Sequence, residues 1–228
     1  MIVSPIPVNG RLPLLRHTLE RLINKNKVTP ICVGDEPEAK ELCESLGVEW
    51  INHANYPLGA KWNAGFVAAR KHNPNGILFV GSSDWVSDDY AIHCEKLLEQ
   101  YDFIGKLGCY FADVAKKIRA VYWKGYESDR IGEPIGIGRV LSNRLLNKIE
   151  WKPFNDLFDN SLDYSMYKKA KNESTYILTD PNQKLVSIST DKWVNKHKFE
   201  DHWTGKTPSR TVGNVDILIE SFPELNLL

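Results

Sequence analysis

The regular alternation of two kinds of segment over residues 1–100 most constrains the fold of this chain. Short apolar segments that favour strands lie near 2–3, 30–33, 48–52 and 77–80. Between and after them, segments 12–23, 37–46, 58–69 and 88–100 repeat apolar residues at helical spacing. This repetition predicts an α/β fold, with a mostly parallel sheet and right-handed crossovers.

The second part of the chain does not continue this regular alternation of strands and helices. It predicts strands near 102–108, 117–123, 175–179 and 184–189, and helices near 139–149, 160–171 and 214–221. Residues 124–138 are rich in glycine and charge and predict a loop. Since no repeat, low-complexity tract or linker interrupts the chain, we expect a single domain over 1–228, with an αβα half at 1–100 and a mixed half at 101–228.

Composition excludes some classes of partner. The 228 residues include 29 basic and 29 acidic side chains, so net charge favours neither nucleic acid nor an anionic membrane. No apolar stretch is long enough to span a bilayer, and we expect neither a signal peptide nor a membrane span. The four cysteines show no CxxC spacing, so we interpret them as reduced thiols of a cytoplasmic protein.

Ligands bind parallel sheets beyond the carboxyl ends of the strands. Pro5, Asp35 and the segment Gly81–Asp84 follow or end predicted strands, so we expect them at this edge. Asp35 could accept a hydrogen bond from a nucleotide base or a ribose hydroxyl. Alternatively, Asp35 caps the helix that follows it, which is a common role for aspartate.

Lys61 stands near the start of a predicted helix, in the segment "NYPLGAKWNAGFVAARKH". A lysine there opposes the helix dipole, whereas a bound phosphate would reverse that penalty. Gly59 and Gly65 weaken the helix but permit close backbone approach. Lys61 therefore either binds an anion or extends to solvent, and the sequence favours neither interpretation.

The segment "GSSDW" could form part of a metal site. Mg²⁺ and Mn²⁺ take oxygen ligands, and Asp84 could supply one if a second protein ligand and a diphosphate complete the set. The segment "HWTGKTP" offers that second ligand as His202, with Lys206 adding charge near a phosphate. His197 competes for the same role. The structural alternatives are a turn residue at Asp84 and an ordinary surface loop around His202.

A further carboxylate, Asp163, falls in the first turn of the helix predicted near 160–171. The helix dipole stabilises an acid at this position, which is sufficient as a structural explanation. The functional interpretation is a general base that takes a proton from an incoming hydroxyl, with Asp159 as the nearest substitute.

Taken in order, these segments resemble the GT-A glycosyltransferases, most closely the inverting family-2 type. "SPIPVNGRLPLLRHTLERL" resembles the opening strand and helix of that family, and "ICVGDEPE" resembles the strand whose acidic end meets the base. "PLGAKWNAGFVAAR" is similar to its asparagine- and glycine-bearing helix, and "ILFVGSSDW" stands at its Asp-x-Asp metal motif. The stretch that ends in "NSLDYSMYKKA" resembles the acceptor side, and "HWTGKTP" the late His-x-x-Gly loop.

The resemblance implies transfer of a hexosyl or deoxyhexosyl group from a nucleotide sugar, with a UDP-sugar as expected donor, to a hydroxyl of a glycan or similar acceptor. The first half would bind the donor, and the second half would hold the acceptor and a C-terminal closing loop. Asp163 would be the general base, and Asp84 and His202 would hold Mn²⁺ or Mg²⁺. The residues implied in nucleotide binding are Pro5, Asp35, Lys61, Ser83, Asp84 and Lys206. The chain departs from the family at Gly81 and Ser83, which stand at the two acidic positions of the metal motif.

Three alternatives remain. A non-catalytic module of the same fold, which binds a nucleotide sugar or a glycan, would explain the depleted acidic motif. A nucleotidyltransferase shares the strand–helix rhythm, but "SPIPVNGRLP" is a poor phosphate loop. A dinucleotide oxidoreductase would need more than "GIGRVL", which has Leu141 where a third glycine belongs.

Overall fold

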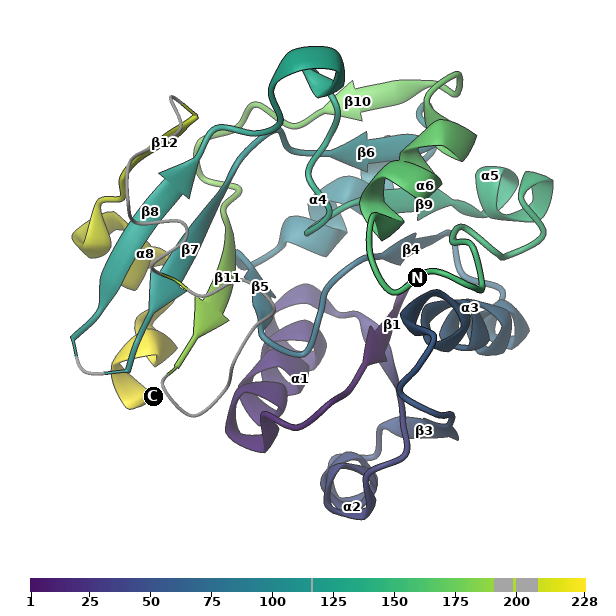
Figure 1. Cartoon of the computed structure of the whole chain (residues 1–228), viewed down its shortest axis with the longest axis horizontal. Helices are drawn as coiled ribbons and strands as arrows, with labels where there is room; N and C mark the ends of the chain where they lie inside the picture. Colours follow the sequence, from purple (N-terminus) through teal and green to yellow (C-terminus); the bar gives the residue numbers. More distant parts are fainter. Residues whose placement is uncertain (116, 191–198, 200–208) are drawn as a thin grey trace.

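The computed structural model describes residues 1–115, 117–190, 199 and 209–228 (Figure 1). Within these residues the strands form two sheets. The seven-stranded sheet has the order β10 (Thr175–Ile177), β6 (Phe103–Gly105), β9 (Val140–Ser142), β4 (Gly76–Leu78), β1 (Ile2–Pro7), β2 (Thr29–Gly34), β3 (Glu49–Asn52). The five-stranded sheet has the order β12 (Arg210–Val212), β8 (Arg119–Trp123), β7 (Cys109–Asp113), β11 (Leu185–Ser189), β5 (Asp84–Val86).

Helices cover both faces of the larger sheet. α1 (Leu12–Asn26), α2 (Pro37–Ser45) and α4 (Tyr90–Leu97) share one apolar cluster with Ile2 and Ile6 of β1. α3 (Leu58–Ala69), α5 (Asn143–Lys148) and α6 (Leu162–Ala170) share another cluster with Val3, which points to the opposite face. Strands β4, β1, β2 and β3 run parallel, so the predicted α/β fold with a parallel sheet and flanking helices is confirmed.

Strand β9 is a departure from the expected helix at 139–149. It lies between β4 and β6 and runs antiparallel to both. Val140 and Leu141 are buried in different clusters, on opposite faces of the sheet, and such a two-sided apolar run is indistinguishable from a buried helix by pattern. The helix begins later, at α5, where the Ser142 hydroxyl accepts the amide of Leu145 at 3.0 Å.

The smaller sheet, at the left of Figure 1, is mostly antiparallel. Its edge strand β5 lies where the sequence indicated a turn, and it pairs with β11 near the other end of the chain. Helix α8 (Val215–Ser221) packs on this sheet through Leu218, which shares a cluster with Trp85 of β5. Val86 and Leu185 belong to the same cluster as Ile6, so the two sheets share one core. Short 3₁₀ turns complete the described part: η1 (Arg70–His72), η2 (Ser128–Arg130) and η3 (Pro223–Leu227).

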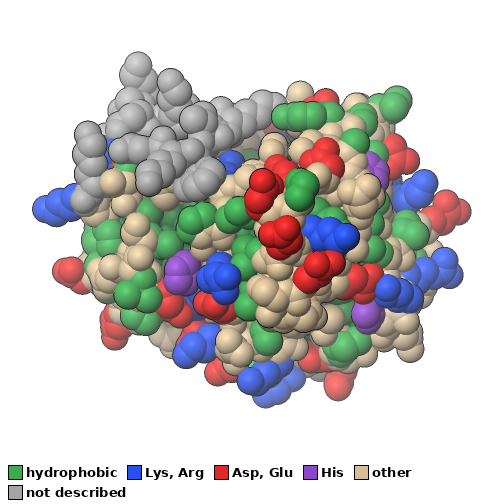
Figure 2. All heavy atoms as spheres, turned by 90° about the horizontal axis from the view of Figure 1, so that it is seen from below, with side chains coloured by type: hydrophobic (Ala, Val, Ile, Leu, Met, Phe, Trp, Pro, Cys, Tyr) green, Lys and Arg blue, Asp and Glu red, His purple; other side chains and the backbone are tan. Residues whose placement is uncertain are grey.

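The face of the molecule drawn in Figure 2 carries charges of both signs. Figure 2 shows acidic and basic side chains interspersed over one face, in agreement with the zero net charge of the sequence. None of the described helices is both long enough and apolar enough to cross a lipid bilayer.

Candidate functional site

Asp84 lies at the start of β5, close to the carboxyl end of β4. The Gly81 amide donates to its Oδ2 at 2.9 Å, and the Ser187 hydroxyl on β11 donates a second hydrogen bond. A Cβ at Gly81 would lie 2.8 Å from Oδ2, so a larger residue at position 81 would displace this carboxylate. Desolvation raises the pKa of Asp84, and these two hydrogen bonds oppose that rise.

Asp163, from the first turn of α6, lies close to Asp84. The negative charge of Asp163 adds to the rise in the pKa of Asp84, and both carboxylates also raise the pKa of Cys109, which is raised mainly by its burial. The Tyr126 hydroxyl donates to Asp163 Oδ2 at 2.9 Å. A Cβ at Gly136 would lie 2.5 Å from Oδ1, so the carboxylate occupies space that only glycine leaves. The structure thus brings together the predicted metal ligand and the predicted base.

A buried ion pair supports the helix start that carries Asp163. Arg139 is 0% exposed and its Nη1 donates to the Asp163 carbonyl at 2.8 Å. Its Nη2 donates to Glu133 Oε1 at 2.9 Å, and Glu133 is 1% exposed. Arg130 donates to both oxygens of the same carboxylate, at 2.6 and 2.7 Å. The segment 124–138, predicted only as a loop, therefore supplies Tyr126, Arg130 and Glu133, and sequence reasoning missed the network that they form with Asp163 and Arg139.

Arg11 is another residue that the sequence did not indicate. It precedes α1 in a left-handed backbone conformation, with φ 61°. Its Nη1 donates to the Ser83 hydroxyl at 2.8 Å, and its charge attracts Asp84. Burial lowers the pKa of Arg11, and Asp84 opposes this effect. A guanidinium therefore stands at the turn where the sequence suggested a metal ion.

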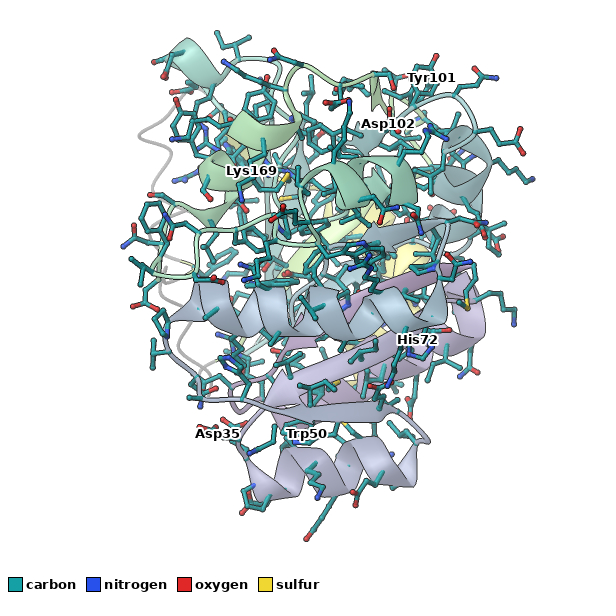
Figure 3. The ribbon with its side chains drawn as sticks, turned by 90° about the vertical axis from the view of Figure 1, so that its right-hand side faces the viewer. Asp35, Trp50, His72, Tyr101, Asp102 and Lys169 are labelled. Carbon is teal, nitrogen blue, oxygen red and sulfur yellow. The ribbon has the colours of Figure 1, made fainter. Side chains whose placement is uncertain are left out.

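Lys61 and Asp35 belong to a second polar cluster at the carboxyl end of β2. Lys61 is 1% exposed, and its Nζ donates to the Val8 carbonyl and to Asn55 Oδ1. Asn55 in turn donates to Asp35 at 2.7 Å. Burial lowers the pKa of Lys61 to about 8, although Glu36 and Asp35 oppose this shift. Figure 3 shows Asp35 and His72 near opposite ends of α3, with Asp35 on the side of the carboxyl ends of the strands. The interpretation that Lys61 extends to solvent is therefore wrong.

The remaining predicted residues are placed as follows. Pro5 is buried in β1, where a Cβ at Gly65 of α3 would lie 2.7 Å from its Cβ. Asp159 accepts the amide of Leu58 at 2.7 Å and so caps α3. His202 and Lys206, with the competing His197, lie outside the described residues.

The described donor set does not fit a divalent metal ion. Across the described ranges, no group of three or more His, Cys, Asp or Glu side chains could hold one. Asp84 is a single carboxylate that already accepts two hydrogen bonds, and the Arg11 guanidinium beside it would repel a further cation. The predicted second ligand, His202, is not among the described residues.

The fold has counterparts among solved structures, although no family model and no curated protein matches the sequence. A mannosyltransferase from Pyrobaculum calidifontis, solved in complex with GDP-Man and Mn²⁺, is similar with a TM-score of 0.53 at 10% identity, over 82% of this chain and 56% of its own. S. aureus TarS is similar with a TM-score of 0.54 at 12% identity, over 82% of this chain and 36% of its own. The present chain thus spans about half and about a third of their lengths. At such identities the likeness concerns architecture, and the chain has a mixed α/β fold similar to that of the GT-A glycosyltransferases.

Proposed function

We propose that this chain transfers a glycosyl group from a nucleotide sugar to a hydroxyl of an acceptor. The observation that carries the proposal is the meeting of Asp84 and Asp163, from distant segments, near the carboxyl end of β4. Parallel sheets bind ligands at this edge. The similarity in fold to a mannosyltransferase supports the same conclusion.

Asp163 has the features of a general base. Its carboxylate is partly accessible, and Tyr126 and Gly136 fix its position. As an acceptor hydroxyl attacks the anomeric carbon, Asp163 takes the hydroxyl proton, and the nucleoside diphosphate departs with the electrons of the broken C–O bond. In-line attack of this kind inverts the anomeric configuration.

The donor side is assigned to the cluster around Asp35. Asp35 is exposed just after β2. Asn55 donates a hydrogen bond to it, and Lys61 donates one to Asn55, so the position of the carboxylate is fixed and it can accept from a base or a ribose hydroxyl. A UDP-sugar is the donor we propose, with a glycan as acceptor. The predicted Mn²⁺ or Mg²⁺ on Asp84 and His202, with Lys206 on the diphosphate, remains a prediction and no step above depends on it.

Release of nucleoside diphosphate from UDP- and GDP-sugars tests the proposal, with water or added glycans as acceptors. Asp163→Asn should reduce release by about 100-fold or more while donor binding persists. Asp159→Asn is the matched control, because asparagine can still accept the Leu58 amide that Asp159 caps. Donor binding without release, unchanged by Asp163→Asn, would instead establish a non-catalytic binding module. Absence of both binding and release would refute the proposal.

A further inference from the structure

We propose that Arg11, and not a divalent metal ion, supplies the positive charge that binds the diphosphate of the donor at this site. This inference rests on the proposed function and concerns the turn Gly81–Asp84. This turn holds a single carboxylate, Asp84, and the structure places a cation beside it.

The conformation of the β1–α1 connection directs Arg11 toward this turn. The Gly10 amide donates to both carboxylate oxygens of Glu36, at 2.8 and 2.9 Å, which fixes the backbone just before Arg11. Arg11 itself has φ 61°, a conformation that costs free energy for a residue with a side chain. Strain of this kind persists where the surrounding contacts impose it, and it is common at ligand sites.

Ser83 holds the guanidinium in place. Ser83 is 3% exposed, and its hydroxyl accepts from Arg11 Nη1 at 2.8 Å. Ser83 directly precedes Asp84 in the turn. An acid there would favour a metal ion, whereas a hydroxyl leaves the negative charge to Asp84 alone, and Arg11 balances it.

Arg11 also has the capacity to bind phosphate. A guanidinium carries five N–H groups, and Ser83 is its one hydrogen-bond partner in the described part of the chain. The remaining N–H groups can form the paired hydrogen bonds that phosphate oxygens accept from arginine. Arg11 is half-buried, so its charge is less screened than that of a surface arginine.

The experiment is titration calorimetry of UDP, GDP, UMP and GMP into the full chain, in EDTA and in Mn²⁺. We expect the wild type to bind a nucleoside diphosphate in EDTA, with little change on adding Mn²⁺. Arg11→Met should weaken diphosphate binding by about ten-fold or more and leave monophosphate binding within about three-fold. Arg11→Lys should fall between the two, because lysine keeps the charge and loses the planar fork.

Two further variants make the result specific. Ser83→Ala removes the hydrogen bond that orients Arg11 and should reduce the preference for diphosphate without changing the charge. Arg16→Met is the matched control, since Arg16 is an exposed arginine of α1, the helix that follows Arg11, and its partner Glu20 is 3.8 Å away. Thermal unfolding of each variant shows that it is folded.

The outcomes separate this inference from the proposed function. Diphosphate binding that EDTA abolishes and Mn²⁺ restores would overturn the role of Arg11 and leave glycosyl transfer standing. If Arg11→Met and the wild type bind the nucleoside diphosphate with equal affinity in EDTA, the role of Arg11 is likewise overturned and glycosyl transfer still stands. If the wild type binds no nucleoside diphosphate under either condition, the proposed function falls and the inference falls with it.

Discussion

Neutralising Glu133 should strongly destabilise the protein. Glu133→Gln keeps the shape of the side chain but removes the negative charge that pairs with Arg139, and both residues are almost fully buried. Removing one partner of a buried ion pair costs about 3–5 kcal/mol. Arg139 keeps its hydrogen bonds to the carbonyls of Ile135 and Asp163, so we expect a loss near the lower limit, about 3 kcal/mol.

Urea unfolding followed by circular dichroism measures this loss, and the melting temperature should fall by about 6–12 °C. The control is Lys40→Met, which removes an exposed pair with Glu44 at 3.7 Å and should cost a few tenths of a kcal/mol. Glu133→Met combined with Arg139→Met should recover part of the stability, since no fully buried charge is left without a partner and Arg130, the other partner of Glu133, is 26% exposed. A loss below about 1 kcal/mol for Glu133→Gln would refute the reasoning, because an exposed ion pair contributes that much to the free energy of unfolding.

Three other predictions concern single side chains of the two clusters. Tyr126→Phe removes the hydrogen bond to Asp163 and should lower kcat about ten-fold with donor affinity unchanged; a change in affinity alone would contradict a positioning role. Gly136→Ala places a Cβ 2.5 Å from Asp163 Oδ1 and should reduce nucleotide release while the urea midpoint changes little; wild-type release would show that the carboxylate has room to move. Folding lowers the pKa of Lys61 from 10.5 to about 8, so between these pH values the folded state binds fewer protons than the unfolded state. The free energy of unfolding of the wild type should therefore rise from about pH 8 to 10.5, relative to that of Lys61→Met. Urea midpoints at pH 7, 9 and 10.5 measure this difference, and parallel curves would refute it.

Apart from β5, the sequence predicted the strands and helices up to α4 well, because each carries a local apolar pattern. It failed where an element depends on distant partners. β5, β9 and β12 were not predicted as strands, and in the structure each pairs with a strand far away along the chain. Val140 and Leu141 are buried because β4 and β6 lie on either side of them. Both strands are distant in sequence, so the residues around position 140 do not reveal them.

The site could be predicted in part for the same reason. Asp84 and Asp163 were indicated by residue type and by resemblance to a family, and the structure brings them together. Arg11 gave no signal, because a loop arginine after glycine is ordinary in sequence. Arg139 did give one, since it is a lone charge within the apolar run from Ile137 to Leu141, and such a residue requires a buried partner.

The pairing of β5 with β11, and of β4 with β9, has a consequence for how the chain folds. When residues 1–100 have been synthesised, the strands that will cover one edge of β4 and pair with β5 do not yet exist. These contacts span large sequence separations, so they are slow to form and leave open strand edges during synthesis. Residues 1–100 should therefore reach their native arrangement only after β9 and β11 have been synthesised, and until then this nascent segment should be a client of chaperones.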